Sequence, residues 1–275
     1  MSIKSMPVWK WLLLLVAGFV LALILYGLVQ VAGDAVSGAD AWVFWLVSLV
    51  LSGAMLVLYA LFVRWFEKHP ARDIPLWMLA ADTGKGFAVG MLFFVAVAAV
   101  MMLLGLYRVT DVGADRLSAV LSAFFMFLYV AVGEEIIFRG VLFRWIDEKW
   151  GFAAALVVSA LLFGAMHIAQ PGAGWWSSLA IAIEAGLLLG AAYKWSGTLW
   201  LPIGIHWAWN FFQGNIFGFA VSGGDAGASL LHSETSGPDL LTGGAFGAEA
   251  SLITVILGLL LSVWFIVRIS ARDRR

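Results

Sequence analysis

Cysteine is absent from the sequence, and charged residues are scarce. The lack of cysteine excludes disulfide bonds, thiolate metal sites and a cysteine nucleophile. Only 12% of the 275 residues are Asp, Glu, Lys or Arg, whereas a soluble domain carries roughly 25%. A formal net charge of −1, without a basic cluster interleaved with aromatic residues, argues against nucleic acid as a partner.

Hydrophobic residues, in contrast, make up 63% of the chain, and the mean hydropathy is +0.98. A helix that spans a membrane needs about 20 predominantly apolar residues. Such runs occur at about 10–31, 41–63, 87–107, 117–138, 151–168, 176–194, 200–220 and 250–268. The first run exceeds the roughly 7 to 15 apolar residues of a signal peptide, so we expect it to be retained. The sequence therefore predicts an all-α, polytopic membrane protein with about eight transmembrane helices.

The basic residues alternate between the two sides that eight crossings define. With the N-terminus inside, all 16 Lys and Arg residues except Arg108 and Arg116 fall in inside segments. Basic residues concentrate in the cytoplasmic segments of membrane proteins. We therefore expect an integral, multi-pass protein of the bacterial plasma membrane with both termini in the cytoplasm.

The connections between the runs are mostly short, with two exceptions. Residues 64–86 form a polar connection, and residues 221–249 form a long outer loop without Lys or Arg. His69 and His232 lie in these segments, and we expect both to be solvated. Glu249 is expected to open the last helix, where the helix dipole favours a carboxylate.

Few strongly polar side chains remain inside the predicted spans. An ionisable residue at membrane depth usually faces the protein interior and indicates a functional site. The fourth to seventh runs contribute, in order, Glu134, Glu135, Arg139, His167, Glu184, His206 and Asn210.

Helical spacing sorts these residues into pairs. Glu135 and Arg139 are four residues apart, so they lie on one face and can form an ion pair. Glu134 points about 100° away around the helix, which leaves it free for chemistry. Phe163 and His167 have the same spacing, so an aromatic ring is expected to pack beneath the imidazole. His206 and Asn210 repeat it on the seventh run.

The turn between the fourth and fifth runs brings two of these groups to one level. We place this turn at Trp150-Gly151, because glycine favours the left-handed conformation that ends helices. Glu134 and His167 both lie about 24 Å from it along their helices. His206 lies roughly 9 Å into the seventh helix. The segment 170–172 then falls at membrane depth, where irregular backbone requires burial or a wet cavity, and we take a water-filled cavity as a hypothesis.

A purely structural role explains these residues less well, because burying so many polar groups without purpose costs several kcal/mol. For Glu184, which no other feature singles out, hydrogen bonding between helices is an equal alternative. Gly186 and Gly190 have the GxxxG spacing, and we interpret them as a helix-packing pair.

Taken together, the patterns Glu-Glu-x-x-x-Arg (134 to 139), Phe-x-x-x-His (163 to 167) and His-x-x-x-Asn (206 to 210) resemble the CAAX protease and bacteriocin-processing enzyme family. The family includes type II CAAX prenyl endopeptidases, lysostaphin-resistance proteins and bacteriocin-immunity proteins. Each pattern alone is weak, but the three in order are specific. The resemblance divides the chain into N-terminal membrane helices (1–116), a CAAX protease-like catalytic core (117–215), and an extracytoplasmic loop with the last helix (216–275).

The resemblance implies an intramembrane endopeptidase. Glu134, with His167, would hold and deprotonate the attacking water as a general base. His206 and Asn210 would face the peptide carbonyl and stabilise the developing oxyanion. The supporting residues would be Glu135, Arg139, Phe163 and Glu184.

Two routes to the attacking water stay open. Glu134, His167 and His206 could supply the three protein ligands of a catalytic zinc ion. The chain lacks the H-E-x-x-H motif, however, and these residues lie on three separate helices. We favour water activated by the carboxylate without a metal ion.

Other classes of function compete with the protease interpretation. A proton-coupled transporter could use the same acids and histidines as a relay, but no pair of broken helices recurs in matching halves. A catalytically silent immunity or scaffold protein is the stronger alternative. As substrates we expect membrane-associated peptides, either CAAX-type lipidated C-termini or bacteriocin and leader peptides.

Overall fold

The computed structural model describes residues 3–113, 116–225 and 227–273, and the predicted all-α class is confirmed for this part of the chain. Short 3₁₀ turns and π-helical segments join or extend several helices. The α-helices are α1 (Val8–Ala35), α2 (Ala41–Phe62), α3 (Leu79–Leu103), α4 (Leu117–Glu135), α5 (Arg144–Trp150), α6 (Phe152–Met166), α7 (Trp175–Ile181), α8 (Leu187–Ser196), α9 (Trp200–Phe211), α10 (Asp239–Thr242) and α11 (Leu252–Asp273).

In the described ranges, seven helical stretches are long and apolar enough to cross a membrane. They correspond to seven of the eight predicted runs and make this an integral, multi-pass membrane protein. The remaining run, 200–220, contains α9, which a π-helical segment extends only to Ile216. The seven stretches are Val8–Ala35, Ala41–Glu67, Leu76–Leu103, Leu117–Trp150, Phe152–Ala169, Trp175–Ser196 and Leu252–Arg272.

The predicted bounds of the polar connection at 64–86 are wrong at both ends, because the flanking helices extend into it. The helical stretch of α2 continues to Glu67, and that of α3 begins at Leu76. Asp82 is buried within α3, where its carboxylate accepts a hydrogen bond of 3.0 Å from the Thr198 hydroxyl. A charged residue can therefore lie inside the helix because a distant part of the chain satisfies it.

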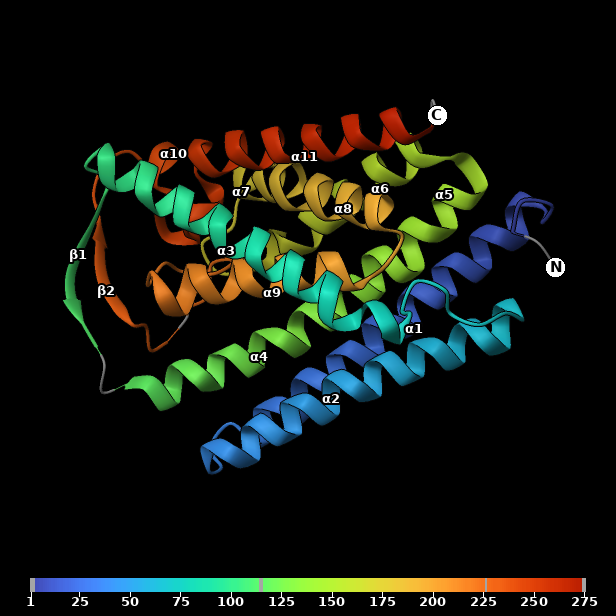
Figure 1. The fold of residues 1–275 in the computed structure, drawn as a ribbon, viewed down its shortest axis with the longest axis horizontal. Coiled ribbons are helices and arrows are strands. Elements are labelled where there is room, and N and C mark those ends of the chain that lie inside the picture. Colours follow the sequence, from blue (N-terminus) through green and yellow to red (C-terminus); the bar gives the residue numbers. More distant parts are fainter. Residues whose placement is uncertain (1–2, 114–115, 226, 274–275) are drawn as a thin grey trace.

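The outer loop is also more regular than expected. Strand β2 (Leu231–Thr235) pairs antiparallel with β1 (Tyr107–Val112), which follows α3. This ribbon stands at the left of Figure 1, at the end of the molecule away from the N-terminus. His232 lies in β2 opposite Asp111, rather than in an irregular loop. His69 is 40% exposed and contacts Glu67 at 3.1 Å.

The segments predicted to lie inside meet at one end of the molecule. Lys149 on α5 donates to the Met6 carbonyl at 2.6 Å, and Lys194 on α8 contacts Asp147 at 2.6 Å. Arg272, near the end of α11, donates to the Trp195 carbonyl at 3.0 Å. The start of α1 and the end of α11 lie at this same end (Figure 1); the side of the membrane that it faces stays a prediction. Arg274 and Arg275 of this basic group lie outside the described residues.

Glycines bring α9 into direct backbone contact with α3. A Cβ atom on Gly90 would overlap the carbonyl oxygen of Ile205, and one on Gly204 would overlap that of Thr83. Gly86 faces the Leu201 carbonyl in the same way. Because neither helix has a side chain at these points, α9 is seated deep in the bundle, and its polar residues are held there.

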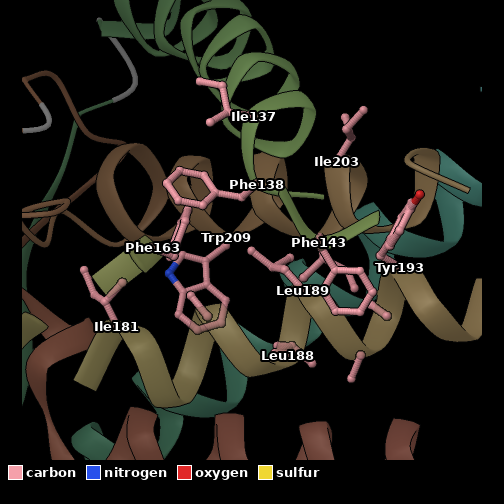
Figure 2. Close-up of a cluster of buried hydrophobic side chains, with 14 of the residues drawn as sticks. Ile137, Phe138, Phe143, Phe163, Ile181, Leu188, Leu189, Tyr193, Ile203 and Trp209 are labelled. Carbon is pink, nitrogen blue, oxygen red and sulfur yellow. The ribbon is translucent and has the colours of Figure 1, made fainter. Parts of the chain in front are cut away.

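The predicted packing role of Gly186 and Gly190 is confirmed. A Cβ atom on Gly186 would lie 2.7 Å from Cα of Ala160, and one on Gly190 would lie 2.9 Å from the Leu156 side chain. These contacts press the helical stretch Trp175–Ser196 against α6. An apolar layer that includes Phe138, Phe163 and Trp209 fills the space between these helices and α4 (Figure 2).

Candidate active site

The buried ion pair predicted on the fourth helix is present. Arg139 Nη1 donates to Glu135 Oε1 at 2.7 Å, and both side chains are 0% exposed. Arg139 lies in a π-helical segment (Ile136–Phe143) that continues α4. Such segments are uncommon and often mark functional sites. The pair therefore joins the end of α4 to the π-helical segment next to it.

Arg139 also holds neighbouring helices in place. Its Nη2 donates to the Gly186 carbonyl at 3.2 Å, and its guanidinium carbon lies 4.8 Å from the centre of the Phe163 ring. Phe163 in turn packs against the His167 imidazole at a centroid distance of 4.9 Å, as the spacing predicted. One buried cation thus positions α6, the π-helical segment before α8 (Ala182–Gly186) and the end of α4 relative to each other.

His206 lies between the two adjacent glutamates. Its Nδ1 contacts Glu135 Oε1 at 2.9 Å, and its Nε2 lies 3.8 Å from Glu134 Oε2. A carboxylate that accepts at Nδ1 orients the ring and leaves Nε2 for chemistry. Sequence spacing did not predict this bond to Glu135, because it joins residues far apart in the chain.

Glu134 has different surroundings from Glu135. Its side chain is 18% exposed, and its Oε1 accepts a hydrogen bond of 3.2 Å from the Tyr26 hydroxyl on α1. The 100° step around the helix thus separates a fully enclosed carboxylate from an accessible one, as predicted from the sequence.

His167 ends α6 and is partly buried. Its Nδ1 contacts the Phe163 carbonyl at 2.7 Å, which leaves Nε2 free of that bond. The predicted turn before this helix is confirmed, because Gly151 has a φ of 88°. Among the described residues, Glu134 and His167 form no direct ion pair with each other, in contrast to Glu134 and His206.

One cavity of about 300 Å³ brings the predicted catalytic residues together. Gln170 also lines it, so the irregular segment after His167 borders a cavity, as the hypothesis required. Polar side chains line it from α1, α4, α9 and the turns after α6 and α9. The predicted residues at this cavity are Glu134, His167, His206 and Asn210.

Glu184 and Glu249 line a second cavity of about 20 Å³, which His167 also borders. Both oxygens of Glu184 are buried without a hydrogen-bond partner. Glu249 accepts a hydrogen bond from the Ser222 amide. Burial raises the pKa of the Glu249 carboxyl, while His167 and Ser222 act in the opposite direction.

Our interpretation of Glu249 as the first residue of the last helix is wrong. It is buried in a 3₁₀ turn (Ala248–Ala250), and α11 begins only at Leu252. Its carboxyl lines the second cavity together with His167 and Glu184. Local sequence does not show such contacts with distant residues.

A catalytic zinc ion needs three protein ligands around one point. Among the residues that it describes, no three His, Asp or Glu side chains lie close enough together to share one ion. Glu134, His167 and His206 border one cavity, but they do not form a ligand set there. The geometry of the described residues therefore does not fit the zinc option.

Sequence reasoning missed the contribution of α1. Tyr26 and Gln30 both line the cavity, yet neither belongs to the three motifs. They are the only residues with a polar side chain, apart from the indole of Trp11, in the apolar stretch 11–33. Two polar side chains four residues apart in an otherwise apolar stretch were the signal from which both residues could have been predicted.

Comparison with known families supports the same region. Residues 116–212 match the family described as type II CAAX prenyl endopeptidase Rce1-like. This match covers α4 to α9 and confirms the resemblance that the motifs indicated. No curated protein and no solved structure matches the chain.

Proposed function

We propose that the protein is an intramembrane endopeptidase that hydrolyses membrane-associated peptides by a water molecule activated at Glu134. The observation that carries the proposal is the shared cavity of Glu134, His167, His206 and Asn210. The family match over 116–212 supports the CAAX-type peptidase class.

Glu134 serves as the general base. Its carboxylate and the His167 imidazole both border the cavity, where the two side chains hold the attacking water molecule. The water oxygen attacks the peptide carbonyl carbon as one of its protons moves to Glu134. The same proton then passes to the leaving nitrogen, and the C–N bond breaks.

His206 and Asn210 stabilise the oxyanion of the tetrahedral intermediate. Both are buried and face the cavity, so their donors act in surroundings with little water. The contact between His206 Nδ1 and Glu135 orients the imidazole, so that Nε2 is the ring nitrogen that faces the oxyanion.

Glu135, Arg139 and Phe163 keep this arrangement in place, through the ion pair and the ring contacts already described. Glu184 belongs to the same group, as a buried carboxyl behind His167. None of these side chains needs to reach the substrate, because each acts through a residue at the cavity.

The position of the cavity among apolar helices indicates the class of substrate. A cavity within apolar helices is reached most readily by a peptide that is itself associated with the lipid bilayer, such as a CAAX-type C-terminus or a bacteriocin leader. With both termini in the cytoplasm of a bacterial cell, the basic end of the bundle faces that compartment.

Cleavage by the purified protein in detergent or lipid tests this function. Wild type is expected to cleave a membrane-associated peptide. Glu134→Ala, His167→Ala and His206→Ala are each expected to lose most of the activity, whereas Tyr107→Phe, at the distant β1 strand, keeps it. If the three active-site variants all cleave like wild type, the protease proposal fails, and an immunity or scaffold role is favoured.

A chelator distinguishes the two routes to the activated water. In the carboxylate route, prolonged treatment with a strong chelator leaves the rate unchanged. Loss of cleavage that added zinc restores would replace this route by a metal-dependent one.

A further inference from the structure

Helix α1 lies outside the region of the family match, yet it reaches the candidate active site. Only 11% of the most apolar stretch of this helix is buried inside the protein, so most of the helix faces outward. Tyr26 and Gln30 are four residues apart and therefore share one face. Both line the cavity that contains Glu134. An otherwise apolar helix thus directs its isolated polar pair at the catalytic carboxylate.

Tyr26 is held close to α4 by the absence of a side chain at Gly133. A Cβ atom at Gly133 would overlap the Tyr26 ring. The ring therefore lies flush against the backbone next to Glu134, and its hydroxyl donates to Glu134 Oε1 at 3.2 Å. Glu134 Oε2 faces His206, so the two carboxylate oxygens have different neighbours.

Gln30 has an unused hydrogen-bonding group at the same cavity. Its Oε1 is buried and has no hydrogen-bond partner. A buried carbonyl oxygen without a partner is costly, and the cost is recovered when a ligand donates to it. Met126 and Phe127 line the same cavity. A chain entering there would have polar groups on the α1 side and apolar groups on the α4 side.

We propose that α1 forms a wall of the peptide-binding site, with Tyr26 as a positioning residue for Glu134 and Gln30 as a binding residue for the substrate main chain. An amide side chain carries one acceptor and two donors, which complement the N–H and C=O groups of an extended peptide. This proposal rests on the proposed protease function and adds its substrate-binding element.

Steady-state kinetics separate the two roles. Tyr26→Phe is expected to lower kcat about tenfold with little change in KM, because a lost hydrogen bond to a charged group is worth about one such factor. Gln30→Leu is expected to raise KM about fivefold to tenfold with little change in kcat. Tyr129→Phe, a buried tyrosine that does not line the cavity, is the matched control and keeps both values.

Measurements that need no cleavage keep the proposal testable if the protease function fails. The infrared difference spectrum between wild type and Glu134→Gln isolates the carboxylate bands of Glu134. In a Tyr26→Phe background these bands are expected to shift, because the hydrogen bond is lost. Glu134→Gln serves as a non-cleaving receptor for a fluorescent membrane-associated peptide, and adding Gln30→Leu is expected to raise its Kd about fivefold to tenfold.

The outcomes distinguish the two proposals. Normal wild-type cleavage, unchanged Tyr26→Phe and Gln30→Leu kinetics and unchanged Glu134 bands would overturn the role of α1 and leave the protease function intact. An inactive wild type would overturn the protease function. The infrared shift would then still decide the role of Tyr26, and an unchanged Kd for the peptide would overturn that of Gln30.

Discussion

Replacing Glu135 by glutamine should destabilise the fold far more than the same change at Glu134. Glu135 is 0% exposed and accepts hydrogen bonds from Arg139 at 2.7 Å and from His206 at 2.9 Å. Glutamine preserves the shape but removes the negative charge, so the buried guanidinium of Arg139 is left without its counter-ion. Breaking a buried ion pair in this way costs about 3–5 kcal/mol.

The matched change at Glu134 removes much less. Its side chain is 18% exposed, and the protein donates to it through the 3.2 Å hydrogen bond from Tyr26. The amide oxygen of glutamine can still accept that bond, so the expected cost is about 1 kcal/mol or less. The two variants should therefore differ by about 2–4 kcal/mol in the free energy of unfolding.

Reversible unfolding in mixed micelles, followed by tryptophan fluorescence, measures this difference. Glu134→Gln should abolish cleavage with nearly normal stability, whereas Glu135→Gln should lose both. A double variant, Glu135→Gln with Arg139→Met, supplies the control. It removes the orphaned charge and should recover part of the lost stability, which a double-mutant cycle quantifies.

Equal stability of Glu134→Gln and Glu135→Gln would refute this reasoning. It would mean that Arg139 draws its compensation from the carbonyl oxygens of Ala185 and Gly186 rather than from Glu135. The division between a structural and a catalytic carboxylate would then have to be abandoned.

Three further predictions test the packing around the site. Gly204→Ala should lower the free energy of unfolding by about 1–3 kcal/mol and lower activity, because the added methyl group forces α9 away from α3. The control is Gly53→Ala, whose Cβ meets nothing within 4 Å; it should be neutral in the same unfolding assay. Phe163→Leu should cost about 1–3 kcal/mol, since it removes ring contacts with Arg139 and His167, and cleavage should fall with it; an unchanged unfolding midpoint would contradict this. Glu184→Met should raise the free energy of unfolding by about 1–3 kcal/mol in the same assay, because two buried oxygens without hydrogen-bond partners are removed. A fall in cleavage activity despite that gain would show that Glu184 serves the site.

Features set by neighbours in the chain were predictable. The pairing of Glu135 with Arg139 and the packing of Phe163 on His167 both follow from helical spacing. The turn at Gly151 followed from the conformational freedom of glycine. In each case the determining interactions lie within one helix or at its end, so the local sequence contains the needed information.

Features set by distant parts of the chain were not predictable in this way. Strand β1 forms only because β2, more than a hundred residues later, pairs with it. Asp82 lies inside a helix because Thr198 satisfies its carboxylate. Glu249 was assigned to a helix end, whereas the fold buries it beside His167 and Ser222. Each error came from judging a charged or polar segment without knowing its partner.

By itself, the sequence determined that this is a membrane protein of helices with charged groups at membrane depth, because hydropathy and helical spacing are properties of short stretches. It also indicated which carboxylate pairs with Arg139. Only the tertiary structure decided that His206 lies between Glu134 and Glu135 and that α1 brings Tyr26 to the site. Those contacts depend on how closely separate helices approach, and small residues such as Gly133 and Gly204 control that approach through the space they leave open.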